Sequence, residues 1–74
     1  MNFVQRLKDI GCENVQGYTL ISNYGYAFTK NGIRYDLRYW ANCYGMDLDY
    51  WSISGLNVSF DSLDKAFEWI KENL

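Results

Sequence analysis

The sequence has no proline and no histidine, and it has only two cysteines. Without histidine, the chain lacks the side chain that most often acts as a general base or a zinc ligand near neutral pH. Cys12 and Cys43 are 31 positions apart, a separation that matches none of the common zinc spacings. We therefore predict two free thiols in a reducing compartment, with no metal and no cofactor.

Long apolar runs and a strong charge of one sign are also missing. The apolar stretches are too short to cross a bilayer, and the first residues do not show the charged and apolar regions of a secretion signal. Seven basic and nine acidic residues are mixed along the chain, with a formal net charge of −2. Nucleic acid binders usually carry a basic patch. We expect a cytoplasmic protein without membrane association, for which nucleic acid is not the main partner.

Aromatic residues are what the chain has in excess. Seven Tyr, four Phe and three Trp occur among 74 residues, which we expect to form one domain over 1–74. A chain of this length buries only about 60% of the surface that it exposes when unfolded, so large side chains or self-association must compensate. A homodimer is therefore one expected possibility, and most of the aromatic side chains have a polar tip that needs a partner or water.

A short helix is predicted over residues 1–11. Asn2 can cap it, Gln5 occupies the capping-box position, and Gly11 can end it. Four apolar residues fall on one face: Phe3, Val4, Leu7 and Ile10. Because such a helix is too short to be stable alone, this face is expected to pack on the rest of the chain.

A longer amphipathic helix is predicted within residues 59–74. Asp61 or Ser62 can cap its first turn, and Asp61 and Lys65 form a favourable i,i+4 pair. Its apolar stripe, which we expect to be core, consists of Leu63, Ala66, Phe67, Ile70 and Leu74. Trp69 lies away from this stripe, so it either packs on the sheet edge or anchors a partner.

The clearest short-range signal is Asn31-Gly32 between two alternating runs, which predicts a hairpin with a type I′ turn. Pairing outward from the turn gives two faces. The core-like face holds Tyr24, Tyr26, Phe28, Ile33, Tyr35, Leu37 and Tyr39. The opposite face holds Ala27, Thr29, Arg34, Asp36, Arg38 and Trp40. A slip of one residue in the pairing would exchange these two faces.

The remaining segments complete the predicted fold. Residues 15–22 and 48–54 are rich in strand formers, residues 23–25 are expected to turn, residues 41–47 to form a loop, and residues 56–60 to be extended. The expected class is α+β: a small antiparallel sheet of three to five strands, with the short N-terminal helix and the amphipathic C-terminal helix packed on one face.

The polar face of the hairpin is the candidate site. Its Arg34, Asp36, Arg38 and Trp40 can be contiguous with Tyr44 and Met46 of the following loop, and Tyr, Trp, Arg and Met are enriched where proteins bind each other. The alternative is a solvated sheet face with a weak Arg and Asp pair. A further alternative is a sheet whose tyrosines stack the bases of single-stranded nucleic acid.

Catalysis is not predicted. Asp47 and Asp49 are the closest carboxylate pair outside the helices, but further oxygen ligands for a cation are missing around them. Cys43 has no run of cations nearby that would lower its pKa. Nucleophile elbows and phosphate-binding glycine loops are absent from the sequence. We expect a protein that is not an enzyme.

These features together predict a small non-enzymatic protein-binding module that acts by steric blocking through its aromatic and arginine surface. In overall character, with one sheet, an aromatic surface and no catalytic motif, the chain resembles the small inhibitors that phages encode against host defence proteins, including anti-CRISPR proteins. The resemblance implies a protein partner in a host cell. It assigns no role to any particular residue.

Overall fold

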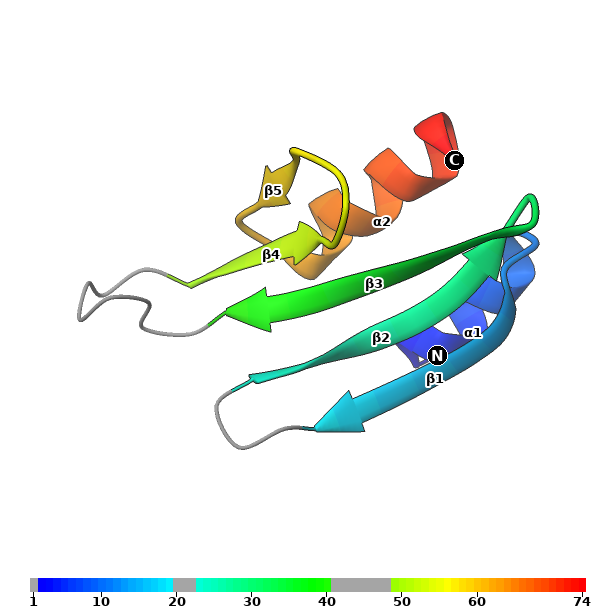
Figure 1. The fold of residues 1–74 in the computed structure, drawn as a ribbon, viewed down its shortest axis with the longest axis horizontal. Helices are drawn as coiled ribbons and strands as arrows, with labels where there is room; N and C mark the ends of the chain where they lie inside the picture. Colours follow the sequence, from blue (N-terminus) through cyan, green and yellow to red (C-terminus); the bar gives the residue numbers. More distant parts are fainter. Residues whose placement is uncertain (1, 20–22, 41–48) are drawn as a thin grey trace.

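The computed structural model describes residues 2–19, 23–40 and 49–74. It shows an α+β fold with one open, five-stranded antiparallel sheet in the order β1-β2-β3-β4-β5, so that every strand pairs with its neighbours in sequence (Figure 1). The elements are α1 (Phe3–Asp9), β1 (Glu13–Thr19), β2 (Asn23–Lys30), β3 (Ile33–Trp40), β4 (Tyr50–Ile53), β5 (Ser59–Phe60) and α2 (Leu63–Asn73). The predicted fold class is confirmed.

Both helices pack against the same face of the sheet. α1 contacts β1, whereas α2 contacts β4 and β5, so each helix covers one half of the sheet (Figure 1). The core between the helices and the sheet contains Phe3, Leu7, Cys12, Phe28, Leu37, Trp51, Ile53, Ala66, Phe67 and Ile70. Among the described residues, none that is polar or charged is buried. This core is purely apolar, and neither α1 nor α2 lies against the other face of the sheet.

The N-terminal helix begins as the sequence predicts. The Asn2 side chain accepts a hydrogen bond from the Gln5 backbone N–H at 2.8 Å, and Phe3 and Leu7 are buried. The Gln5 side chain does not complete the capping box, because its Nε2 donates to Asp9 at 3.0 Å instead. A side chain that bonds one turn ahead stabilises the helix without reaching back to the cap.

The C-terminal helix also agrees with its pattern. Of the two predicted caps, Ser62 occupies the N-cap and accepts from the Lys65 backbone N–H at 3.2 Å. Asp61 instead forms the predicted i,i+4 ion pair with Lys65, at 3.0 Å. The two helices contact each other through the Phe3 and Phe67 rings, whose centres lie 6.0 Å apart, and through Arg6, whose guanidinium carbon lies 4.2 Å from the centre of the Phe67 ring.

The hairpin has the predicted turn and register. Asn31 and Gly32 both have positive φ angles, 53° and 79°, as a type I′ turn requires. Phe28 pairs with Tyr35 and Tyr26 pairs with Leu37, so the two predicted faces are confirmed.

Three segments differ from expectation. Residues 23–25 do not turn, because they begin β2 and pair with β3. Residues 56–60 contribute only the two-residue strand β5 at Ser59–Phe60. β1 begins two residues earlier than predicted, at Glu13, and its register shifts between Glu13 and Gln16. This irregularity bends the edge strand locally.

The lengths and apolar content of the helices bear on whether they could cross a membrane. In the ranges that the structure describes, no helix is both long enough and apolar enough to cross a bilayer.

Candidate partner-binding face

The face of the sheet opposite the helices carries most of the predicted site. We call it the open face and define it by seven side chains from β1, β3 and β4. They are Tyr18, Arg34, Asp36, Arg38, Trp40, Tyr50 and Ser52. Alternation along the strands directs them away from the core, because their neighbours in sequence, such as Leu37 and Trp51, are buried under the helices.

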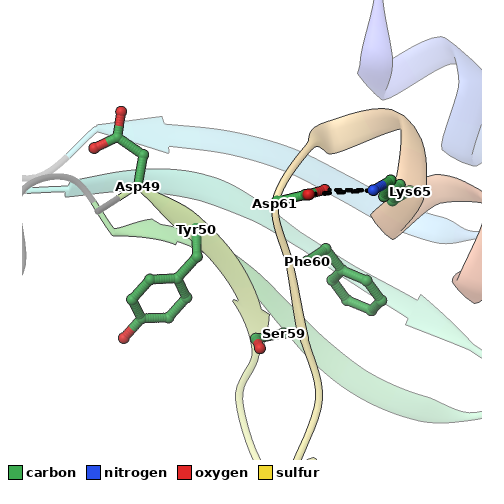
Figure 2. Close-up of a pocket in the computed structure, with 6 residues that line it drawn as sticks. All are labelled: Asp49, Tyr50, Ser59, Phe60, Asp61 and Lys65. Atoms are coloured by element: carbon green, nitrogen blue, oxygen red, sulfur yellow. Dashed lines mark hydrogen bonds and ion pairs between the residues drawn. The ribbon is translucent and has the colours of Figure 1, made fainter. Parts of the chain in front are cut away.

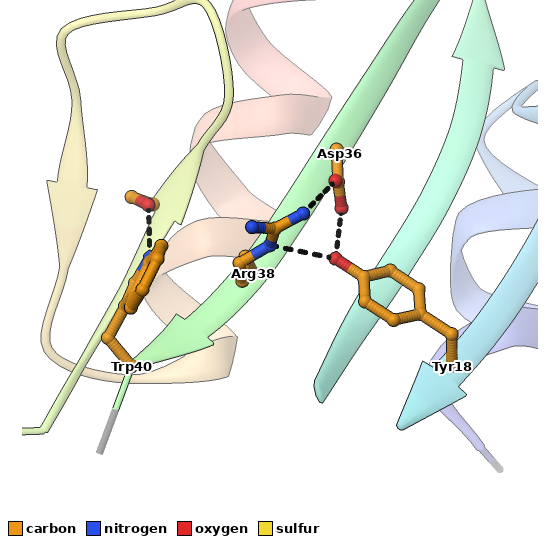
Figure 3. Close-up of polar contacts among 5 residues, drawn as sticks. Tyr18, Asp36, Arg38 and Trp40 are labelled. Carbon is orange, nitrogen blue, oxygen red and sulfur yellow. Dashed lines mark hydrogen bonds and ion pairs between the residues drawn. The ribbon is translucent and has the colours of Figure 1, made fainter. Parts of the chain in front are cut away.

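A polar network occupies the centre of the open face (Figure 3). The Tyr18 hydroxyl donates a hydrogen bond to Asp36, and Arg38 Nε donates to the Tyr18 oxygen at 3.2 Å. Arg38 Nη2 also donates to Asp36 Oδ2, at 3.0 Å. Each member therefore contacts the other two. We call this set the Tyr18–Asp36–Arg38 network.

Gly25 makes the network possible. It lies in β2 between Tyr18 on one side and Arg38 on the other, and it pairs with both. A Cβ at this position would collide with the Leu37 carbonyl oxygen and would lie 3.0 Å from the Tyr18 hydroxyl. Because Gly25 has no side chain, the Tyr18 ring can cross β2 and reach β3.

The charges of the network are compensated within it. The side chains of Asp36 and Arg38 are 30% and 32% exposed, so their ion pair is partly desolvated but not buried. Burial, followed by the hydrogen bond to Asp36, raises the pKa of Tyr18 above its usual value. The hydrogen bond to Tyr18 makes the largest contribution to raising the pKa of Arg38. At neutral pH, Tyr18 is therefore a neutral donor and Arg38 is a cation held in place.

Trp40 extends the open face toward β4. Its indole Nε1 donates to Ser52 Oγ at 2.9 Å, and Arg38 lies 5.6 Å from the centre of its ring (Figure 3). Trp40 also pairs directly with Tyr50 across the strands. The half-buried indole is thus fixed by one hydrogen bond and by its cation neighbour, with little freedom to lose when a partner binds.

The other predicted site residues are not all part of this cluster. Arg34 is exposed on the open face, but its Nη1 donates to the Asn14 carbonyl at 2.8 Å and to Thr29 Oγ1 at 3.2 Å, so it fastens β1 to the hairpin. The structure brings together Asp36, Arg38 and Trp40. Tyr44 and Met46, which we predicted to extend the site, lie outside the described residues, as do Cys43 and Asp47.

A pocket of about 510 Å³ lies where the open face meets β5 (Figure 2). Its walls are Asp49, Tyr50, Ser59, Phe60, Asp61 and Lys65. Tyr50 belongs both to this pocket and to the open face, so the aromatic surface continues from Trp40 into a recess. A recess beside a flat aromatic surface can receive one projecting side chain of a partner.

The polar groups at the centre of the open face are engaged with one another. A neutral phenol is neither a base nor a nucleophile, and Asp36 is already engaged by two donors. In the ranges 2–19, 23–40 and 49–74, no group of three or more potential ligand side chains could hold a metal ion. The open face presents a large aromatic surface at Trp40 and Tyr50 beside the Arg38 cation, which its hydrogen bonds hold in place.

Sequence reasoning missed Tyr18, Tyr50, Ser52 and the role of Gly25. Tyr18 could have been found from the pairing of the predicted strand over residues 15–22 with the hairpin, because a tyrosine opposite a glycine is free to lie across it. The glycine was instead interpreted as part of a turn. Ser52 and Tyr50 required the register between β3 and β4, which no short turn connects.

Comparison with known proteins adds nothing to this description: no protein family, no curated protein and no solved structure matches the chain.

Proposed function

We propose that the protein is a non-enzymatic protein-binding module whose open face blocks a surface of another protein. The single observation that supports this most directly is the arrangement of Arg38 and Trp40. Both are half-buried, hydrogen-bonded and adjacent on the sheet face opposite α1 and α2. Trp and Arg are the residue types that most often dominate binding energy, and fixing them beforehand lowers the entropy cost of association.

The balance of charges supports a protein partner more than a nucleic acid. Arg38 is paired with Asp36 at 3.0 Å, so among the described residues of the open face only the exposed Arg34, outside the central network, has a positive charge without an ion-pair partner. The formal net charge of the whole chain is −2. A surface that contacts phosphates needs several uncompensated cations.

The cellular setting follows from the same proposal. Cys12 is a free thiol buried in the core, and burial raises its pKa, which suits a reducing cytoplasm. The overall resemblance to phage inhibitors of host defence proteins makes a bacterial cytoplasmic protein the first partner to seek. Steric blocking needs no cofactor and no catalytic group.

Capture from a bacterial lysate tests the proposal. The tagged protein is incubated with lysate, with and without nuclease, and the retained proteins are identified by mass spectrometry. We expect the wild type to retain one protein, at about equal stoichiometry, after nuclease treatment. We expect Lys71→Ala, on α2, to retain the same protein. We expect the open-face variant Trp40→Ala to lose it. A partner retained equally by Trp40→Ala would contradict the proposal.

Single-stranded nucleic acid is a second candidate, because three rings lie along the open face at Tyr18, Trp40 and Tyr50. Such rings can stack unpaired bases. Titration with labelled oligonucleotides at low and high salt separates the two candidates. Affinity that falls steeply with salt would favour nucleic acid, and no binding at low salt would remove this candidate.

Self-association is a third candidate function. β1 is an outer strand of the sheet and pairs only with β2. An outer strand can pair with a second copy. Sedimentation at high micromolar concentration tests this. A dimer would support the pairing, and a monomer would remove it.

A further inference from the structure

A second surface lies on the helix side of the molecule, away from the open face. Between β5 and the outer side of α2 there is a groove of about 390 Å³, lined by Phe60, Asp64, Lys65, Glu68, Trp69 and Glu72. We call it the Phe60–Trp69 groove. Its two rings are half-buried and their centres lie 5.8 Å apart, so they form an apolar floor that solvent reaches.

Of the charged residues around this floor, some form ion pairs and others do not. Asp64 is paired with Arg6 at 2.9 Å, and Lys65 is paired with Asp61 at 3.0 Å. Glu68 and Glu72 are both exposed, and neither forms an ion pair with any residue that the structure describes. Two like charges four residues apart on a helix repel each other. The groove therefore has a net negative rim.

An aromatic floor with two free carboxylates at its rim is the chemistry that recognises a cationic side chain. A guanidinium or an ammonium gains from the face of an indole and from a charge-assisted hydrogen bond to a carboxylate at the same time.

We propose that the Phe60–Trp69 groove binds a basic segment of a partner protein, in which an arginine or lysine meets Glu68 and Glu72 while an adjacent apolar side chain covers Phe60 and Trp69. This site contains none of the seven side chains that define the open face, although Phe60 and Lys65 also line the pocket beside that face. If the groove and the open face are both occupied, the protein can bring two protein surfaces together.

A defined peptide tests the groove directly. The probe is a fluorescein-labelled, acetylated decapeptide of alternating arginine and leucine, and its control has glutamate in place of arginine. Binding is measured by anisotropy at low salt. We expect the arginine peptide to bind saturably and the glutamate peptide not to bind.

Matched variants distinguish the effect of the charges at the groove from the effect of the net charge of the protein. Glu68→Gln with Glu72→Gln removes two negative charges at the groove, and Asp9→Asn with Glu13→Gln removes two elsewhere. We expect the first pair to weaken binding about tenfold or more and the second pair by less than about twofold. Equal weakening by both pairs would mean that only net charge matters, and it would overturn the proposal.

The position of the peptide is read from the indole N–H signals in a nuclear magnetic resonance titration, assigned with Trp69→Phe and Trp40→Phe. We expect the Trp69 signal to move and the Trp40 signal to stay. Movement of the Trp40 signal alone, or no saturable binding, would overturn the proposal. No saturable binding would leave the proposal for the open face unaffected, whereas movement of the Trp40 signal alone would place the peptide on the open face.

Discussion

Tyr18 and Gly25 face each other across β1 and β2, and the missing side chain of Gly25 is what lets the Tyr18 hydroxyl reach β3. This relationship joins three strands on the open face through one phenol. It also holds Arg38 beside Trp40, so the proposed binding surface depends on a glycine that contacts no partner itself.

Replacing Gly25 with alanine tests this relationship. The new Cβ would collide with the Leu37 carbonyl oxygen in the paired strand, so β2 and β3 must separate. We expect a loss of about 3 kcal/mol or more in the free energy of unfolding, measured with urea. Gly17→Ala is the control, because its Cβ would lie 3.5 Å from the Tyr26 ring in ordinary contact. We expect it to change stability by less than about 1 kcal/mol. Similar losses for both variants would contradict this interpretation.

Removing only the Tyr18 hydroxyl should destabilise the fold less than Gly25→Ala does. Tyr18→Phe keeps the ring over Gly25 but deprives Asp36 of a donor and Arg38 of an acceptor. We expect a loss of about 1 to 2 kcal/mol in urea unfolding. Tyr35→Phe, on the helix side of the sheet, is expected to cost less than about 0.5 kcal/mol. If the two variants are equally stable, the network contributes nothing to folding.

The pH dependence of stability follows from the raised pKa of Tyr18. A phenol whose pKa is higher in the folded state binds its proton more tightly there, so its contribution is complete below the unfolded value of 10.0 and is lost as the pH rises through the folded value. The pKa of Tyr39 is also raised, first by its hydrogen bond to Asp49.

We therefore expect the free energy of unfolding to fall as the pH rises above about 10, and to fall less steeply in Tyr18→Phe. Urea titrations at intervals from neutral to strongly alkaline pH measure this slope. An unchanged slope in Tyr18→Phe would show that its proton is bound equally in both states.

The contact between the helices should depend on Arg6 more than on its ion-pair partner. Asp64 is 83% exposed, so the ion pair is weak, whereas the Arg6 guanidinium covers the Phe67 ring. We expect Arg6→Ala to cost about 1.5 kcal/mol and Asp64→Asn about 0.5 kcal/mol, by thermal and urea unfolding. Equal costs would mean that the ion pair, and not the ring contact, joins α1 to α2.

Much of the fold could be predicted because its signals are local. The Asn31-Gly32 turn determines the hairpin register, and with it the faces of Arg38 and Trp40. The Ser62 cap and the apolar stripe of α2 lie within a few turns of one helix. Each of these features needs only neighbouring residues, so the sequence pattern alone is enough to identify it.

The centre of the candidate site could not be predicted, because it depends on pairing between distant strands. Tyr18 reaches Asp36 only through the register of β1, which shifts between Glu13 and Gln16. Gly25 is expected in a turn but lies in a strand, where a Cβ would collide with the Leu37 carbonyl oxygen and would lie 3.0 Å from the Tyr18 hydroxyl. The sequence alone does not distinguish a glycine that leaves space for a neighbouring side chain from a glycine that forms a turn.

The affinity of the captured partner for Trp40→Ala, compared with Lys71→Ala, tests the central proposal most directly. Titration calorimetry gives both affinities, and circular dichroism shows whether each variant is folded. We expect Trp40→Ala to bind about thirtyfold more weakly than the wild type, which corresponds to about 2 kcal/mol, and Lys71→Ala to bind as the wild type does. A folded Trp40→Ala that binds with wild-type affinity would show that the open face is not the binding surface.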